Sequence, residues 1–177
     1  MAYAQALSLT PQSFRSVPFV ELRQALASRI PIISPFVEQL MCFIARFRNR
    51  DGSELDIEMA LREALANAIL HGNQQDSRKC VHVVCRCTID GEVSITVQDE
   101  GQGFDADLIA DPTTPENRLL TQGRGIYLMK TLMDEVRFEQ RGAIVFIRKA
   151  SNARPGQEGK KDDPTTRPRS AVDGGNR

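Results

Sequence analysis

The sequence contains no tryptophan, few other aromatic residues and no long apolar run. Of its 177 residues, none is Trp, 2 are Tyr and 8 are Phe. No stretch approaches the roughly 20 consecutive apolar residues that a membrane-spanning helix requires. The first six residues, Met-Ala-Tyr-Ala-Gln-Ala, lack the basic and apolar regions of a signal peptide. We therefore expect a cytoplasmic protein that does not contact the membrane.

An excess of charge and an organised set of cysteines are also absent. The chain has 23 Lys and Arg residues against 23 Asp and Glu residues, so its charge does not predict direct binding to nucleic acid. Cys42, Cys80, Cys85 and Cys87 show no C-x-x-C spacing and no accompanying histidine pattern, which argues against a zinc site. Cysteines without such a framework are typical of reduced thiols in the cytoplasm.

The length and an apolar content of 41% are those of one globular domain with a sizeable core. Residues 34–150 are expected to form the main body of this domain, and residues 1–33 to add an N-terminal strand region to it. The last 27 residues hold three Pro, four Gly and no aromatic residue. Because such a segment buries too little apolar surface to offset its ordering entropy, residues 151–177 are predicted to be a disordered tail.

The order of the predicted elements indicates an α+β fold. Residues 13–33 are expected to supply one or two strands. Ser34-Pro35 predicts a helix start, with a helix to about residue 48, and a second helix is predicted over 54–71 with Gly72 as its C-terminal cap. Asp90-Gly91 and Arg141-Gly142 separate alternating apolar runs and predict two hairpins, with a short helix over 125–133 before the second. We expect a two-layer sandwich, a mostly antiparallel sheet with helices on one face.

Three polar side chains interrupt the apolar second helix. Glu63, Asn67 and His71 are spaced four residues apart, which places them on one helix face in an α-helix. A carboxylate, a carboxamide and an imidazole among Ala and Leu residues are unfavourable to bury unless they are paired. The partner could be another side chain, or it could be a metal and a phosphate.

Two glycine-containing loops offer contacts for a ligand. Asp99 ends a predicted strand and can accept a hydrogen bond from an amine, and Gly101 and Gly103 follow it. Gly123-Arg124-Gly125 precedes a predicted helix, where amide N–H groups, the helix dipole and a guanidinium suit a phosphate. Each loop alone is as well explained by an ordinary turn or linker.

Together and in this order, the three segments resemble the N, G1 and G2 boxes of the GHKL ATPases, which include gyrase B, MutL and the histidine kinases. The segments are Glu63-x-x-x-Asn67-Ala-x-x-His-Gly, Asp99-x-Gly-x-Gly-Phe and Gly123-Arg-Gly-Ile. The resemblance covers roughly residues 34–149. The short third box and the following residues 128–138 resemble the anti-sigma-factor serine kinases of the RsbW type.

The resemblance implies roles for individual residues. Asn67 would coordinate Mg²⁺ and Asp99 would bind the adenine amino group of ATP. Glu63 would be the catalytic general base that takes a proton from a serine or threonine hydroxyl. His71 is better explained as a structural residue at the helix end. The remaining predicted nucleotide contacts are Gly101 and Gly103 beside base and ribose, and Gly123, Arg124 and Gly125 around the phosphates, with residues 105–122 as a lid.

The function that follows is an ATP- and Mg²⁺-dependent serine/threonine kinase that acts as an anti-sigma factor. Its expected partners are an anti-anti-sigma protein of the STAS type, a sigma factor and a second copy of the chain in a homodimer. An alternative is a nucleotide-gated regulator that binds a partner without phosphorylating it. A regulator of a phosphatase or of a larger signalling complex would use the same fold.

Overall fold

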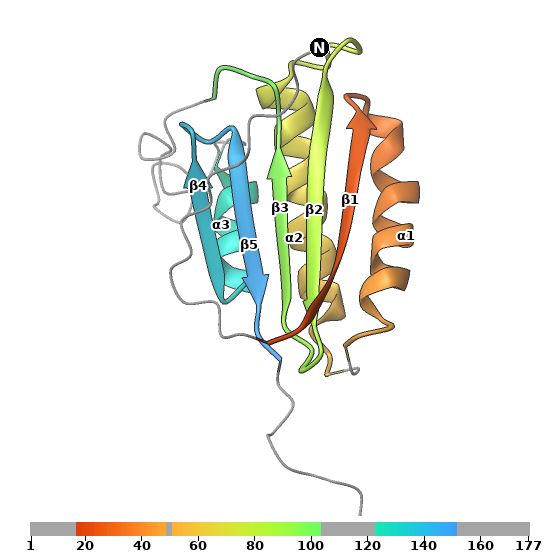
Figure 1. The fold of residues 1–177 in the computed structure, drawn as a ribbon. Helices are drawn as coiled ribbons and strands as arrows, with labels where there is room; N and C mark the ends of the chain where they lie inside the picture. The colour runs from red at the N-terminus through yellow and green to blue at the C-terminus, as the bar shows by residue number, and fades with distance from the viewer. Residues whose placement is uncertain (1–16, 49–50, 104–122, 152–177) are drawn as a thin grey trace, which may run out of the picture.

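The computed structural model describes residues 17–48, 51–103 and 123–151, and within these ranges it forms one sheet covered by helices (Figure 1). None of the described helices has the length and apolarity to span a bilayer. The elements in chain order are β1 (Phe19–Ala27), a 3-10 turn (Ile30–Ile32), α1 (Ile33–Ile44), α2 (Glu54–Asn67), a π turn (Ala68–Gly72), β2 (Cys80–Thr88), β3 (Val93–Gln98), α3 (Arg124–Leu132), β4 (Glu135–Glu139) and β5 (Ile144–Lys149).

The five strands of the described ranges form one antiparallel sheet in the order β1-β2-β3-β5-β4. Cys85 in the middle of β2 pairs with Leu22 of β1 and Ile95 of β3, which fixes the register. Figure 1 shows the three helices on one side of the sheet, with α2 between α1 and α3. The predicted α+β class and two-layer arrangement are therefore confirmed.

Alternation along the strands explains why one face of the sheet forms the core. On β2, Val81, Val83, Cys85 and Cys87 are buried, whereas His82 between them is exposed. The helices face these strands with aliphatic side chains that are fully or almost fully buried. The largest are Leu40 and Ile44 of α1, Ile57, Leu61 and Leu65 of α2, and Met129 of α3.

Both predicted hairpins are present. β2 and β3 are joined through Asp90-Gly91, where Gly91 has a φ of +88°. β4 and β5 are joined through Arg141-Gly142, where Gly142 has a φ of +83°. Backbone in this left-handed region suits glycine, so these short sequences determine where the chain reverses.

The start and the end of the first helix differ from the prediction. Pro31 lies in a 3-10 turn that begins the helical path early, so α1 starts at Ile33 and Ser34 is inside it. The Ser34 hydroxyl accepts a hydrogen bond from Arg62 of α2 instead of capping the helix. The helix also ends at Ile44, before the predicted Arg48, and residues 13–33 contribute one strand in their described part.

Arg48 lies beyond the end of α1, and its side chain is in the interior. It is 5% exposed and donates hydrogen bonds to the carbonyls of Gly91 and Ala150 and to the Ser53 hydroxyl. It also pairs with Asp51 at 2.7 Å. A buried guanidinium with several acceptors joins the first hairpin, the end of β5 and the start of α2 at the end of the molecule opposite the candidate site.

Candidate functional site

Helix α2 carries Glu63 and Asn67 one turn apart, and both side chains are half-buried beside α3. His71 does not continue this row and is exposed. The π turn that starts at Ala68 rotates the side chains after Asn67 out of α-helical spacing, and the Asn73 N–H donates to the Ala68 carbonyl five residues back at 2.8 Å. The predicted alignment of three side chains therefore holds for two of them and is wrong for His71.

Asp99 lies at the end of β3 and is almost completely buried. The residue is 8% exposed, and its Oδ1 accepts a hydrogen bond from the Gly101 N–H at 2.8 Å. Burial raises the pKa of Asp99 above its ordinary value, and this outweighs the opposing effects of the Gly101 N–H and the positive charge of Lys79. A buried carboxylate with remaining acceptor capacity is suited to one specific hydrogen-bond donor.

Two glycines allow the Asp99 carboxylate to occupy this position. A side chain at Gly72 would overlap the Asp99 carboxylate, and a side chain at Gly101 would overlap the Gly72 carbonyl. Gly72 does not have the positive φ of a helix C-terminal cap, so the role predicted for it is wrong. It is a glycine because the end of the α2 segment and the end of β3 approach each other too closely for a Cβ.

Asn73 holds the same two segments together and was missed in the sequence. It is fully buried, its Nδ2 donates to the Cys80 carbonyl at 2.9 Å, and its Oδ1 accepts from the Glu100 N–H at 2.8 Å. The Asn73 side chain thus fixes the residue that follows Asp99. An Asn directly after Gly72 is also typical of an exposed turn, so only its burial distinguishes this role.

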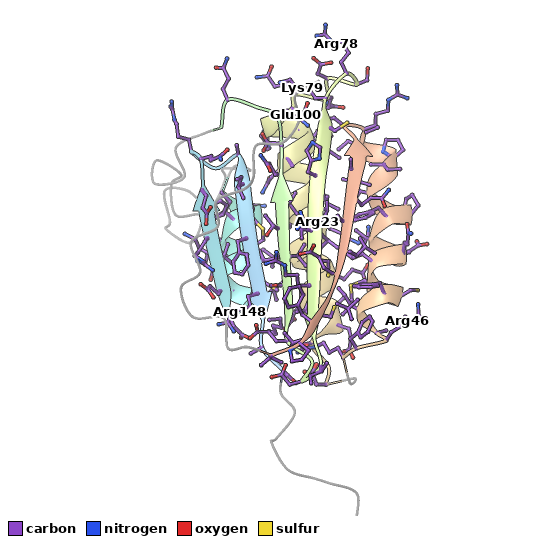
Figure 2. The ribbon with its side chains drawn as sticks, viewed as in Figure 1. Arg23, Arg46, Arg78, Lys79, Glu100 and Arg148 are labelled. Atoms are coloured by element: carbon purple, nitrogen blue, oxygen red, sulfur yellow. The ribbon has the colours of Figure 1, made fainter. Side chains whose placement is uncertain are left out.

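Charged side chains surround this end of the sheet. Glu100 Oε1 lies 3.3 Å from Nε2 of His82, and its Oε2 accepts from the Cys80 N–H at 3.3 Å. Figure 2 shows Lys79 and Glu100 at the same end of the strands, opposite the end where Arg148 lies. Lys79 therefore contributes positive charge near Asp99, in agreement with its effect on the Asp99 pKa.

The Gly123-Arg124-Gly125 segment forms the beginning of α3. Gly123 is the N-cap residue and has a φ of +87°, a conformation that other residues rarely adopt. Gly125 lies against α2, since a Cβ built on it would be 2.5 Å from Oε2 of Glu63 and 3.5 Å from Nδ2 of Asn67. The structure therefore brings the predicted catalytic residue, the predicted metal ligand and this glycine segment together.

Gly103 is placed by a different contact. It has a φ of +74°, and a side chain there would overlap the Arg141 carbonyl in the turn between β4 and β5. This packing inside the protein accounts for the glycine without a ligand. Phe104 and the predicted lid, residues 105–122, lie outside the described residues, as does the predicted tail from residue 152 onward.

The residues at Asn67 fit a magnesium ion that is carried by a nucleotide. The described ranges contain no cluster of three or more His, Cys, Asp or Glu able to hold an ion alone. Mg²⁺ at nucleotide sites is bound by one or two side chains and by substrate phosphates. The Asn67 carboxamide is half-buried, makes no hydrogen bond with another described residue, and offers an oxygen of the required kind.

The fold and this arrangement define a class of protein, and comparison with known families agrees. Residues 28–149, which are most of the chain, match the family model of the histidine kinase-like ATPase domain. The chain therefore belongs to the histidine kinase-like ATPase family.

Within this family, the chain is similar to anti-sigma F factors and to a serine-protein kinase of the RsbW type. The anti-sigma F factor of Geobacillus stearothermophilus is 33% identical over 113 residues, which cover 61% of this chain and 77% of that protein. The anti-sigma F factor of Priestia megaterium is 32% identical over 99 residues, with 53% and 67% covered. Serine-protein kinase RsbW of Bacillus subtilis is 34% identical over 95 residues, 50% of this chain and 59% of RsbW. The chain thus spans about three fifths of RsbW.

A solved structure shares the fold. The crystal structure of the RsbU and RsbW domains of a Mycobacterium tuberculosis protein matches 75% of this chain and 34% of that chain, with a TM-score of 0.50 and 20% sequence identity. At this identity the likeness extends to the architecture alone, and it agrees with the five-stranded sheet and the helical layer described above.

Proposed function

We propose that the protein is an ATP- and Mg²⁺-dependent serine kinase that phosphorylates an anti-anti-sigma protein of the STAS type and binds a sigma factor. Its relatives are named anti-sigma F factor and serine-protein kinase RsbW. A homodimer is the expected form of the protein, and it stays a prediction.

The observation that carries the proposal is the order of three groups along one helical segment. Glu63 is followed after four residues by Asn67, and after five more by Gly72, against which the buried Asp99 packs. The π turn separates Asn67 from Gly72, so the two residues lie about one helical turn apart along the segment. A nucleotide bound with its base at Asp99 would extend its phosphates toward Asn67 and the start of α3, with Glu63 beyond them.

Each residue has a chemical task in this arrangement. Asp99 accepts a hydrogen bond from the adenine amine, and the amides at the start of α3 donate to phosphate oxygens. Glu63 accepts the proton of the acceptor hydroxyl while that oxygen bonds to the γ-phosphorus. The bond between the γ-phosphorus and the bridging oxygen breaks, and ADP leaves with the electron pair.

Asn67 would hold the metal through its carbonyl oxygen. A bound Mg²⁺ neutralises negative charge on the phosphates and orients them. Asn67 is therefore expected to act on nucleotide binding, whereas Glu63 is expected to act on the transfer step.

Transfer of labelled phosphate tests the proposal. STAS-type proteins that co-purify with the chain are incubated with γ-labelled ATP and either the natural protein or Glu63→Gln. Removal of a general base is expected to slow the transfer by about 10²–10⁴-fold. Glu58→Gln is the matched control, because Glu58 lies on the same helix and pairs with Arg62 at 2.8 Å. Undiminished transfer by Glu63→Gln would mean that the base is assigned wrongly.

The same experiment separates the kinase from a regulator that binds without chemistry. A regulator would retain its partner in a nucleotide-dependent manner and leave the partner's mass unchanged. The carboxylate of Glu63, which lies beside Asn67 and Gly125, favours the kinase, because binding alone does not require a base at this position.

A further inference from the structure

The first turn of α3 contains a glycine that its backbone conformation does not require. Gly125 is the second residue of the helix, and its φ is not among the positive values found at Gly123 and other glycines. Glycine inside a helix is less favourable than alanine at the same position. A different reason must therefore account for the missing side chain at residue 125.

The space beside Gly125 is occupied by the end of one side chain. A Cβ at this position would lie 2.5 Å from Oε2 and 3.4 Å from Cδ of Glu63, well inside normal contact distance for the oxygen. The next neighbour, Nδ2 of Asn67, would be 3.5 Å away, which is an ordinary van der Waals contact. A methyl group at residue 125 would thus displace the Glu63 carboxylate and leave Asn67 in place.

The displacement is inexpensive for folding, because a carboxylate at the end of a flexible side chain can rotate away. For catalysis it is expected to be serious, since a general base must stay within hydrogen-bond reach of the proton that it removes. We propose that Gly125 is a positioning residue for Glu63: its missing side chain reserves the volume that the carboxylate occupies. This deepens the proposed function and rests on Glu63 being the general base.

The two glycines of this segment then have different tasks. Gly123 allows the left-handed backbone from which α3 starts, at a φ of +87°. Gly125 provides room for a carboxylate from the neighbouring helix. Its backbone N–H would remain in an alanine variant, so any amide contact to phosphate would be retained.

The test is the variant Gly125→Ala, measured in three ways on the full chain. We expect an unfolding temperature no lower than that of the natural protein, because alanine is the better helix former. Calorimetric Kd values for ATP with Mg²⁺ should stay within about twofold, since binding groups are unchanged. The rate of single-turnover phosphate transfer to the STAS-type acceptor should fall at least about tenfold. This is less than the loss expected on removing the general base, because the displaced carboxylate is still present.

A second substitution makes the result specific to Glu63. Glu63→Asp shortens the acid by one methylene and should reduce transfer in the natural background. In the Gly125→Ala background it should increase transfer, because the shorter side chain fits beside the methyl group. Lys130→Ala, on the exposed side of α3, is the control for alanine substitution in that helix.

Several results would overturn the inference. If Gly125→Ala transferred phosphate at the rate of the natural protein, the Glu63 carboxylate would not need the space beside residue 125. A parallel loss of ATP affinity and transfer would show that Gly125 acts on the phosphates instead. If Gly125→Ala and Glu63→Gln both transfer phosphate at the natural rate, Glu63 is not the general base and the proposed function fails. If Gly125→Ala is fully active while Glu63→Gln is impaired, only the positioning role of Gly125 fails.

Discussion

The candidate site has two ends that are built differently: a base end around Asp99, where the proposed function places adenine, and a phosphate end around Glu63 and Asn67. At the base end, Asp99 is 8% exposed, bonded to the Gly101 N–H and fixed through Asn73, which joins the α2 segment to both neighbouring strands. At the phosphate end, Glu63 and Asn67 are half-buried and have no side-chain hydrogen bond to any residue within the described ranges.

This difference indicates when each end acquires its partners. The groups around Asp99 are ordered by folding itself, so they can recognise a base without rearranging. Glu63 and Asn67 keep their hydrogen-bonding capacity, which a metal, a phosphate and a hydroxyl would satisfy. We expect substitutions at the base end to alter selectivity and stability, and substitutions at the phosphate end to alter metal-dependent binding and transfer.

The largest effect on binding is expected at the phosphate end. Asn67→Ala should weaken the binding of ATP with Mg²⁺ about 100-fold, or about 2.8 kcal/mol, because the side-chain ligand of the metal is lost. Calorimetric titration of ATP with and without Mg²⁺ measures the affinity. Glu63→Gln is the comparison, and its affinity should stay within about threefold of that of the natural protein. Equal affinity of Asn67→Ala and the natural protein would refute the metal-ligand role.

At the base end, Asp99→Asn should change which base is preferred. Loss of a charged acceptor should weaken ATP binding by about 10–100-fold, as expected for a hydrogen bond to a charged group. The carboxamide can donate to the carbonyl of inosine, so the affinity for ITP should rise. Competition between ATP and ITP measures the ratio, and an unchanged preference would contradict base recognition by Asp99.

Asn73→Ala tests whether the base end is preformed. Two buried groups, the Glu100 N–H and the Cys80 carbonyl, would lose their partner, and we expect about 2–4 kcal/mol lower unfolding free energy in urea. If Asn73 also positions Asp99, the preference for ATP over ITP should fall several-fold. If Asn73 is purely structural, its substitution should lower the affinities for ATP and ITP alike. His82→Ala, on the exposed face of the sheet, is the control for this region.

The smallest effect is a pH dependence of stability. Burial raises the pKa of Asp99 in the folded protein above its ordinary value of 3.8, so ionisation of this group opposes folding. Its contribution to stability is present in acid and is lost as the pH rises through the folded pKa. Asp99→Asn should therefore be the more stable protein at pH 7, with an advantage that shrinks as the pH falls through the folded pKa of Asp99 and is smallest below about pH 4. An advantage that grew in acid would reverse the sign and contradict the burial argument.

Local signals in the sequence predicted much of the fold. Asp90-Gly91 and Arg141-Gly142 located both hairpins because the backbone at these turns depends on the residues themselves. The second helix was predicted from 54 to 71, and its α-helical part ends at Asn67. The alternating apolar runs on either side of the two hairpin turns form β2 and β3, and β4 and β5.

The remaining features depend on contacts between distant segments. The sequence predicts a helix cap at Gly72, and only the approach of Asp99 shows why it is a glycine. Asn73 and Arg48 have no periodic or local signal, since their roles depend on hydrogen-bond partners that lie in or beside β2, β3 and β5. The π turn that separates His71 from Asn67 likewise has no signature in a single sequence.

The most direct test of the central claim is the intact mass of the co-purified STAS-type protein after incubation with ATP and Mg²⁺. We predict one phosphate adduct with the natural protein and with Glu58→Gln, and none in the same time with Glu63→Gln. An unmodified partner that is nonetheless retained only in the presence of nucleotide would contradict the kinase assignment.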